Sequence, residues 1–425
     1  MKTITLLTSG TRGDVVPYIA LGLGLRAAGY QVRIAAPIGF KSLIKPLRGG
    51  VTAPLQFMPF EGNPSDLMVN RSEPLTLSRS ILRSIRATLQ FLDQASDIYA
   101  HMLRTAADAC RGTDLLVYGL PTLWGAHIAE GLKIPGIRAV LQPVTPTREF
   151  ASALLPFRFN FLGIGNRLSH WIVNQVTWLA WRSEINQARR TQFGLPRAHW
   201  LDPSLRPIPE QPLTLNGFSE RIVPRPKDWN DKQVITGYWR SSNKQDFSST
   251  QIQRFIERTP ERTLAVGLGS PGAKDMLTFI HTLDAALKES DAQAVLTVPN
   301  EWHRRFTSSR ILPVEHAPHD WLYPRVRAAV HHGGAGTTSA SLHAGTPQII
   351  LPLGIDQFFW GERVYKIGVG TKPIPQRSLT VNKLANAIQQ ALADTSMRAR
   401  AKNVSVALSL DDGVQAAVRV IREIL

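Results

Sequence analysis

Short apolar runs alternate with helical segments along both halves of the chain, and this alternation most strongly limits the folds open to it. In the first half, the apolar run Ile4–Thr8 ends in the glycine turn Gly10–Gly13, and a helical pattern follows over Val15–Ala28. Strands that alternate with helices form parallel sheets that the helices cover. The second half repeats this rhythm around Leu264–Leu268 and Ala328–His332. The sequence therefore predicts an α/β protein with two doubly wound domains that face each other.

Prolines mark the expected boundary between the two domains. They crowd the stretch from about Arg197 to Trp239, which suits an extended connection better than a helix. We expect a first domain over 1–215, a linker over 216–240 and a second domain over 241–425. The last helical stretch would cap the second domain or cross back onto the first. Two further segments, about 71–110 and 150–190, have helical periodicity and are predicted to be insertions in the first domain.

Charge and cysteine content narrow the partners and the compartment. The chain carries 49 Lys and Arg against 32 Asp and Glu, a formal net charge of +17 that favours an anionic partner such as phosphate or an acidic membrane face. The excess is diffuse and forms no basic strip, so nucleic acid is not expected. A single cysteine, Cys110, excludes an intramolecular disulfide and a CxxC metal site. No signal peptide or long apolar run is recognisable, and we expect a cytoplasmic protein.

The strongest local signal is the run HHGGAGTT at His331–Thr338, which follows an apolar strand and opens a helix. Small residues let a ligand approach the backbone, and the free amides at a helix N-terminus attract anions. The run predicts a phosphate cradle without a Walker lysine, although glycines that serve only tight packing would give the same pattern. A metal held by His331 and His332 is disfavoured, because adjacent strand residues point to opposite faces and neither cysteine nor carboxylate lies nearby.

A second signal, Gly10–Val15, lies at the end of the first strand, where open α/β sheets bind ligands. The three-glycine fingerprint of dinucleotide-binding proteins is absent there, and the second strand ends in Ala35 and Ala36 rather than in an acid. Asp14 has two interpretations that both remain open. It is either a functional carboxylate or an ordinary acid at a helix N-terminus, which stabilises by about 0.5–1 kcal/mol.

At these motifs the sequence resembles a known family. The stretch TSGTRGDVVPYIALGLGLRAAGYQVRIAAP resembles the N-terminal segment of sterol 3-beta-glucosyltransferases and of the bacterial glycosyltransferases that decorate glycopeptides and macrolides. The stretches IVPRPKDWNDKQVITGYWR and APHDWLYPRVRAAVHHGGAGTTSASLHAGTPQIILPLGIDQFFWGERVYKIGVG resemble the donor half of the sterol enzymes. The resemblance implies the family 1 GT-B fold, in which two Rossmann-like domains bind the nucleotide-sugar donor mainly on the second domain and the acceptor on the first.

The resemblance also assigns roles to residues of the donor site. His332 and the turn Gly333–Thr338 would hold the donor diphosphate, Asp356 and Gln357 the sugar hydroxyls. His316 and Ala317 stand where plant relatives carry a Trp-Ala-Pro motif against uracil, so a histidine replaces the flat stacking residue. The full set of implied donor-site residues is Thr11, Ser270, His316, Ala317, His332, Gly333, Gly334, Gly336, Thr337, Thr338, Asp356 and Gln357.

Asp14 would be the catalytic base, since it falls where related plant enzymes carry a histidine and antibiotic enzymes an aspartate. A carboxylate there could take the proton of the acceptor hydroxyl as it attacks the anomeric carbon, which inverts the configuration. The glycine turn would stabilise the leaving group in place of a cation. The sequence lacks a DxD pair, in keeping with metal independence. No cofactor is expected besides the UDP-sugar co-substrate, which is expected to be UDP-glucose.

The acceptor side is less specified by the sequence. One insertion gathers aromatic residues that would either line a pocket for a flat hydrophobic molecule or pack in the core. They are Phe150, Phe157, Phe159, Phe161, Trp171, Trp178 and Trp181. A basic, apolar helix expected at about 75–92 would either lie on a membrane surface or merely expose its basic side to solvent.

Together these features predict a metal-independent, inverting glycosyltransferase that moves glucose from UDP-glucose to a hydroxyl of a lipophilic acceptor such as a sterol. A macrolide, polyketide or flavonoid acceptor with a dTDP-sugar is the main alternative. A nucleotide-sugar epimerase and a non-catalytic helper subunit that binds nucleotide sugar also remain open. The sequence does not specify the oligomeric state.

Overall fold

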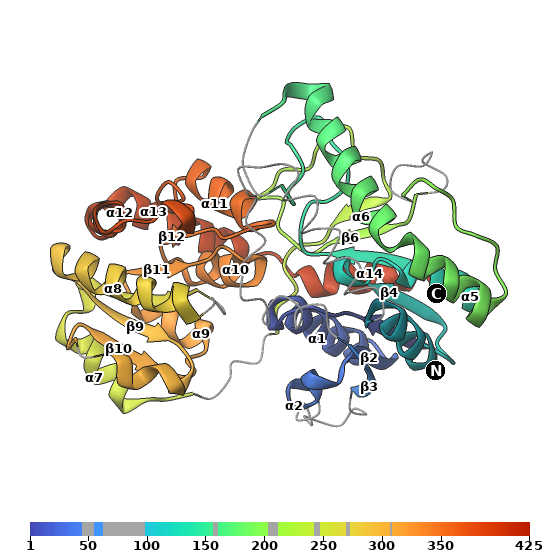
Figure 1. The fold of residues 1–425 in the computed structure, drawn as a ribbon, viewed down its shortest axis with the longest axis horizontal. Helices are drawn as coiled ribbons and strands as arrows, with labels where there is room; N and C mark the ends of the chain where they lie inside the picture. The colour runs from blue at the N-terminus through green and yellow to red at the C-terminus, as the bar shows by residue number, and fades with distance from the viewer. Residues whose placement is uncertain are drawn as a thin grey trace.

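The chain folds into two α/β domains that lie side by side, as the sequence predicted (Figure 1). The computed structural model describes residues 1–44, 55–62, 98–155, 160–202, 211–241, 247–268, 273–306 and 308–425, with the side chains of 273–275 excepted. The expected basic helix at about 75–92, as well as Ser270, lies outside the described residues.

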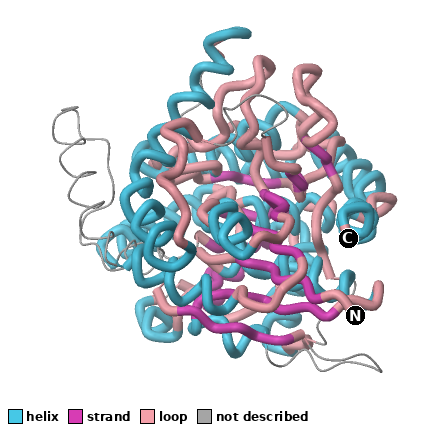
Figure 2. Tube along the Cα trace, turned by 90° about the vertical axis from the view of Figure 1, so that its right-hand side faces the viewer, coloured by secondary structure: helices cyan, strands magenta, loops and turns pink. Residues whose placement is uncertain are grey.

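The first domain is built on a seven-stranded sheet in the order β3-β2-β1-β4-β5-β6-β7, in which every neighbouring pair is parallel. Its strands are β1 (Thr3–Leu7), β2 (Gln31–Pro37), β3 (Gln56–Phe60), β4 (Leu115–Tyr118), β5 (Gly136–Val140), β6 (Thr214–Asn216) and β7 (Gln233–Ile235). The helices are α1 (Arg12–Ala27), α2 (Lys41–Ile44), α5 (Gly125–Leu132) and α6 (Leu162–Phe193), and a further helix runs through 98–109. Helices flank the strands on both sides (Figure 2).

The second domain has a five-stranded parallel sheet in the order β10-β9-β8-β11-β12. Its strands are β8 (Thr263–Gly267), β9 (Gln293–Thr297), β10 (Ile311–Val314), β11 (Ala328–His331) and β12 (Gln348–Ile350). The helices that follow along the chain are α7 (Thr250–Arg258), α8 (Ala273–Glu289), α9 (His319–Leu322), α10 (Ala335–Ala344), α11 (Gln357–Lys366), α12 (Val381–Ala393), α13 (Thr395–Leu408) and α14 (Gly413–Ile424).

The central strands form where the sequence is continuously apolar, because a parallel sheet covered on both faces buries both sides of each strand. All residues of β1, β4 and β11 are buried. Each sheet thereby anchors a core of its own, one around Leu6 and Val117 and the other around Val266 and Val330. These rigid sheets fix where the loops at the strand ends can lie.

The last helix, α14, packs on the first domain although it ends the chain. Ala417, Val418 and Ile421 are buried in the core that surrounds α1 (Figure 1). The main chain of α1 passes so close that a Cβ on Gly24 would lie 2.2 Å from Val414 Cγ1. The sequence left open whether the final helix caps the second domain or crosses back onto the first. In the structure it lies on the first domain.

The segment expected to link the domains also takes part in both of them. Its strand β7 closes one edge of the first sheet, while Phe218 and Ile222 pack against Trp360 of α11 in a core that joins the domains. Across the same junction, Arg363 donates to the carbonyl of Ile222 at 2.9 Å. The connection is therefore a packed part of the domain junction.

Candidate functional site

Two glycine-bearing helix starts, one from each domain, meet at the junction. β1 leads into α1 and β11 leads into α10, both at the carboxyl ends of their sheets, where α/β proteins bind ligands. A Cβ placed on Gly336 of α10 would lie 3.7 Å from the Cα of Gly13 in α1. The first turns of the two helices are thus close to contact.

The turn between β11 and α10 is shaped by Gly333 and by the buried His331. Gly333 has φ +91°, and a Cβ there would lie 2.7 Å from Ile350 Cγ2 and 3.1 Å from the carbonyl oxygen of Gln357. His331 Nδ1 accepts the Gly333 amide at 3.1 Å, while Nε2 faces Gln348 Oε1 at 3.0 Å. Burial lowers the pKa of His331 to about 3, so the ring is neutral. His331 therefore positions the turn.

The same turn carries polar groups that suit an anion. Gly334 is the N-cap of α10 and supplies no capping side chain, which leaves the amides of the first turn without one. Two buried side-chain atoms beside it, His332 Nδ1 and Thr338 Oγ1, have no hydrogen-bond partner. Buried polar atoms are normally paired, so orphans at a helix N-terminus point to a ligand. Gly334, Gly336 and Thr337 are all half-buried at this surface.

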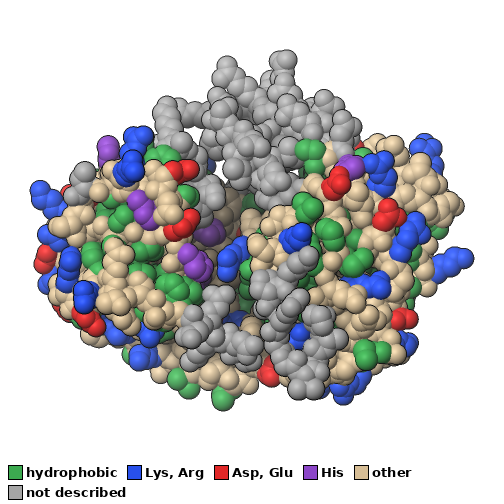
Figure 3. Space-filling model, turned by 90° about the horizontal axis from the view of Figure 1, so that it is seen from below, with side chains coloured by type: hydrophobic (Ala, Val, Ile, Leu, Met, Phe, Trp, Pro, Cys, Tyr) green, Lys and Arg blue, Asp and Glu red, His purple; other side chains and the backbone are tan. Residues whose placement is uncertain are grey.

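Arg12 from the first domain and three histidines from the second lie around the turn. Arg12 opens α1 in the first domain, and its charge acts on His316 and His319 of the second. Burial lowers the pKa of both histidines, and the Arg12 charge lowers them further. Burial likewise lowers the pKa of His332. Seen from below, histidine side chains lie beside a basic side chain near the junction of the two domains (Figure 3). The lowered pKa values favour the neutral form of these histidines, so the positive charge that would attract an anion comes from Arg12.

Asp14 stands on the first-domain side of this junction, three residues into the start of α1. Its Oδ2 accepts the amide of Thr11 at 2.8 Å and the Thr11 hydroxyl at 2.9 Å. Gly10 makes room for it, since a Cβ at Gly10 would lie 2.6 Å from that oxygen. Burial raises the pKa of Asp14, although the Thr11 hydrogen bonds act in the opposite direction. The carboxylate is therefore held in one orientation and is a better base than a free one.

Asp356 stands on the second-domain side as the N-cap residue of α11. Its Oδ2 accepts from Trp360 Nε1 at 3.0 Å, and the side chain of Gln142 from the first domain also hydrogen-bonds it. Burial raises the pKa of Asp356 to about 6, and the negative charge of Asp14 adds to this rise. Two carboxylates from opposite domains therefore lie near each other at the junction.

Most of the residues assigned from the resemblance therefore meet at one place. Asp14, Thr11, the turn at His332–Thr338 and Asp356 lie together, and His316 stands beside them. Gln357 is adjacent, but its Oε1 already accepts the amides of Leu353 and Gly354 at 2.7 and 3.3 Å. The side chain of Ala317 is buried in the core beneath, so only its backbone can face a ligand.

Four residues of this site escaped the sequence analysis, namely Arg12, Gln142, His319 and Trp360. Arg12 sits within the motif that contains Asp14, and His319 follows His316 by three residues. Gln142 lies two residues after the end of β5, at the carboxyl edge that faces the other domain. Its place at the carboxyl end of a strand is the sequence signal that would have identified Gln142. Nothing in the sequence ties Trp360 to Asp356 except a spacing of one helical turn.

The aromatic residues of the insertion do not share one pocket. Trp178 is buried in the core, Trp181 stacks on Tyr99 with ring centroids 3.5 Å apart, and Phe161 and Trp171 face solvent. Phe150 packs against Phe359 of α11, with ring centroids 5.4 Å apart. Phe157 and Phe159 lie outside the described residues. Of the two interpretations, core packing holds for Trp178.

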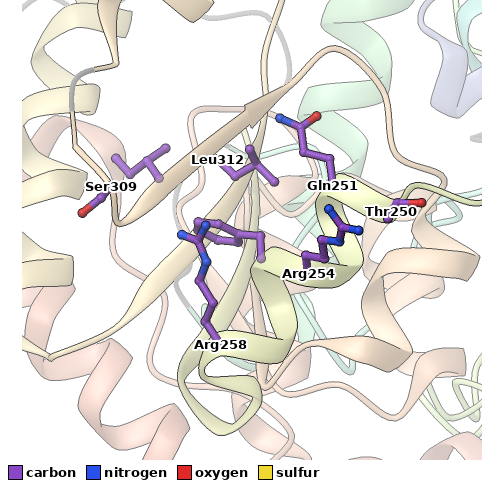
Figure 4. Close-up of a pocket in the computed structure, with 8 residues that line it drawn as sticks. Thr250, Gln251, Arg254, Arg258, Ser309 and Leu312 are labelled. Atoms are coloured by element: carbon purple, nitrogen blue, oxygen red, sulfur yellow. The ribbon is translucent and has the colours of Figure 1, made fainter.

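A separate cavity of about 440 Å³ lies between α7 and β10 (Figure 4). Arg254 and Arg258 of α7 line it, and Arg258 lies over the Phe255 ring with its guanidinium carbon 5.4 Å from the ring centre. None of the predicted site residues lines this cavity.

The described part of the chain lacks two features, a metal-binding cluster and a membrane-spanning helix. It holds no group of three or more histidine, cysteine, aspartate or glutamate side chains placed to bind a metal ion. None of its helices combines the length and apolar character needed to cross a bilayer.

Comparisons with known proteins agree with this architecture. Residues 4–151 match the model of the glycosyltransferase family 28 N-terminal domain, and residues 281–411 match that of the erythromycin biosynthesis protein CIII-like C-terminal domain. The glycosyltransferase of kitacinnamycin has a similar fold, with a TM-score of 0.73 and 16% identity over 100% of this chain and 99% of that one. Glycosyltransferase VinC, solved in complex with dTDP, gives 0.66 and 17% over 99% of both chains.

Two Rossmann-like domains with facing helix starts, matched by glycosyltransferase family models over residues 4–151 and 281–411, have the architecture of GT-B glycosyltransferases. The chain is also similar to sterol 3-beta-glucosyltransferases. It is 33% identical to the enzyme of Aspergillus fumigatus over 437 residues, which cover 98% of this chain and 29% of that protein. The chain thus spans less than a third of this relative's length. The predicted family resemblance and fold class are confirmed.

Proposed function

We propose that this chain transfers glucose from UDP-glucose to a hydroxyl of a lipophilic acceptor such as a sterol, with inversion and without a metal ion. The observation that carries the proposal is the meeting of Asp14 with the anion-binding turn of the opposite domain. The turn can bind the leaving diphosphate, and the carboxylate can accept the proton of the attacking hydroxyl. The junction therefore holds both groups that a displacement at a sugar carbon needs. The similarity to sterol 3-beta-glucosyltransferases supports the acceptor class.

In the proposed reaction, Asp14 takes the proton of the acceptor hydroxyl while its oxygen attacks the anomeric carbon. The bond between that carbon and the β-phosphate oxygen breaks on the opposite face, and UDP leaves with the electron pair. The amides of α10, together with His332 and Thr338, would stabilise the growing negative charge. Asp356 would orient the sugar hydroxyls, for which its carboxylate must exchange the Gln142 bond for a bond to the sugar.

A dTDP-sugar with a polyketide-like acceptor is the second candidate. It is favoured by fold neighbours such as VinC, which was solved with dTDP, while His316 at the expected base-stacking position leaves the choice of base open. The proposal is tested by offering UDP-glucose and dTDP-glucose in turn with sterols, macrolides and flavonoids, and detecting products by mass spectrometry. A sterol glucoside formed from UDP-glucose supports it. Product from dTDP-glucose and a macrolide alone overturns the substrate assignment, and nucleotide binding with no product from any pair indicates a helper subunit.

Chelation of divalent cations is expected to leave the turnover rate unchanged, because the proposed leaving-group stabilisation comes from backbone amides and side chains of the protein. The measurement is the initial rate with and without EDTA. The anomeric configuration of the product, read by NMR, reports on inversion in the same samples. Strong inhibition that Mg²⁺ or Mn²⁺ reverses would contradict the metal-free mechanism, and a retained α configuration would contradict direct displacement.

Arg12 is expected to bind the donor diphosphate from the acceptor domain. Arg12→Gln should weaken UDP binding by about tenfold, since a hydrogen bond to a charged group contributes roughly 1.5–3 kcal/mol. Folding stability should change little, because the side chain is exposed and a cation at a helix N-terminus is unfavourable to the helix. Isothermal titration calorimetry measures the affinity. Arg419→Gln, at an exposed position of α14, is the matched control, and equal UDP affinities of both variants would remove the assignment of Arg12.

A further inference from the structure

The first half of α6 has its apolar side turned outward. We define the outer face of α6 as Ile164, Leu168, Trp171, Ile172, Val176 and Leu179. These side chains are 40–75% exposed, and their spacing of three and four residues aligns them along one side of the helix. The stripe spans about 22 Å at 1.5 Å per residue. A helix of a globular protein normally turns such a stripe inward.

Polar side chains on the inner face fix this orientation. Asn166 donates to the carbonyl of Arg148 at 3.0 Å, and Ser169 accepts the amide of Ser152 at 2.9 Å. Six residues further on, Gln175 donates to the carbonyl of Trp200 at 2.8 Å. Turning the apolar stripe inward would break all of these hydrogen bonds. Each break would leave a buried polar group without a partner, which destabilises the fold. The outward stripe is therefore a stable feature of the fold.

The charge around the outer face favours an anionic partner. No acidic residue occurs from Leu162 to Ser183, while Arg167 is exposed among the apolar side chains. The chain as a whole carries +17. The exposed Trp171 and the neighbouring Trp200, which is 55% exposed, are of the type that settles at the boundary between lipid and water. The first turns of α6 extend beyond the rest of the molecule, so a flat surface can reach them (Figures 1 and 2).

We propose that the outer face of α6 docks the protein onto the surface of an anionic lipid bilayer. An apolar helix face with basic flanks lies in the plane of the interface, with its apolar side chains among the acyl chains and its cations near the headgroups. This mode requires neither the length nor the continuous apolar sequence of a spanning helix. It also places the contact on α6 instead of the expected helix at about 75–92.

The docking helix is packed close to the candidate site. His170, on the inner face, contacts the Phe150 ring with centroids 5.9 Å apart, and Phe150 in turn contacts Phe359 of α11, the helix that Asp356 begins. Docking would thus bring the junction of the two domains near the lipid surface. A further consequence, that an acceptor held in the membrane reaches the candidate site directly, rests on the proposed function. The docking itself does not.

The test is co-sedimentation of the full chain with phosphatidylcholine vesicles that contain or lack phosphatidylglycerol. The wild-type protein is expected to bind the anionic vesicles, and the bound fraction is expected to fall with added salt. The double substitution Leu168→Gln/Ile172→Gln should lower vesicle affinity about 100-fold, or about tenfold per side chain removed from lipid. The matched control Val406→Gln/Leu410→Gln alters two residues that are 66% and 76% exposed on the second domain, and should bind as the wild type does.

Thermal melts and analytical ultracentrifugation of the same three proteins complete the test. All three should melt alike, since the substituted side chains are exposed. No binding of wild-type protein to anionic vesicles, or binding that Leu168→Gln/Ile172→Gln leaves intact, overturns the proposal. A wild-type dimer that this variant converts to monomer without any vesicle binding would assign the outer face to a second copy of the chain and overturn it too. None of these readouts depends on glycosyl transfer.

Discussion

Replacing Asp14 with asparagine is expected to lower turnover by about 10²–10⁴-fold, the usual contribution of a positioned general base. Asparagine keeps an oxygen that can accept from the Thr11 amide, which the carboxylate accepts at 2.8 Å, so the start of α1 should persist. What it loses is the ability to take a proton from the acceptor hydroxyl. UDP binding should survive, because the turn at Gly333–Thr338 belongs to the other domain. Steady-state kinetics and calorimetry measure the two effects separately.

The pH profile distinguishes a base from a merely structural carboxylate. Burial raises the pKa of Asp14 above its usual value, and only the ionised form can accept a proton. Turnover of the wild-type protein should therefore fall as the pH is lowered through this raised pKa, at a higher pH than an ordinary carboxylate would give. The residual activity of Asp14→Asn should lack that acid limb. Asp394→Asn neutralises a carboxylate at the N-cap of α13 and should keep both rate and profile. Wild-type turnover in Asp14→Asn would exclude the base.

The sequence predicts the central strands and the helix starts well, because these depend on local physics. Strands such as Leu115–Tyr118 are continuous apolar runs, as burial on both faces requires. The strands that it misses lie at the sheet edges or are very short. β3 contains Pro59 and β10 contains Pro313, and proline disfavours a strand assignment everywhere except at an edge, which is where both strands lie. Tertiary packing decides which strands lie at the edge of a sheet. The local sequence pattern therefore does not reveal an edge strand.

The helix α6 shows the same limit for orientation. Its apolar period predicts a helix correctly, yet the period alone would place the apolar side in the core. The structure has it outward because the partners of Asn166 and Gln175 are backbone groups of distant loops. Likewise, the site joins Gln142 and Asp356 across more than 200 residues of sequence, a contact that follows only from the packing of two domains. The sequence identifies the motifs on each domain. It does not predict that they lie close together, because this depends on how the two domains pack.

Gly333→Ala is expected to abolish most of the nucleotide binding while the two sheets still fold. Two effects add at this position. The backbone has φ +91°, which costs a residue with a side chain about 1–3 kcal/mol, and the new methyl would lie 2.7 Å from Ile350 Cγ2. The turn must shift to relieve this contact, which would move the amides of α10 away from the diphosphate. A loss of UDP affinity of at least about tenfold follows from the loss of one or two charge-assisted hydrogen bonds.

A second glycine distinguishes the effect of backbone strain from the effect of a steric clash. Gly194, which ends α6, also has a positive φ, +63°, but a Cβ there meets no atom within 4 Å. Gly194→Ala should therefore lower the melting temperature, through the left-handed backbone alone, and leave UDP affinity intact. Calorimetric titration and thermal unfolding of both variants give the comparison. If Gly333→Ala binds UDP as tightly as Gly194→Ala does, the diphosphate does not rest on this turn. The leaving group would then need a different partner. The proposed mechanism, in which the turn stabilises the leaving group opposite Asp14, would be wrong.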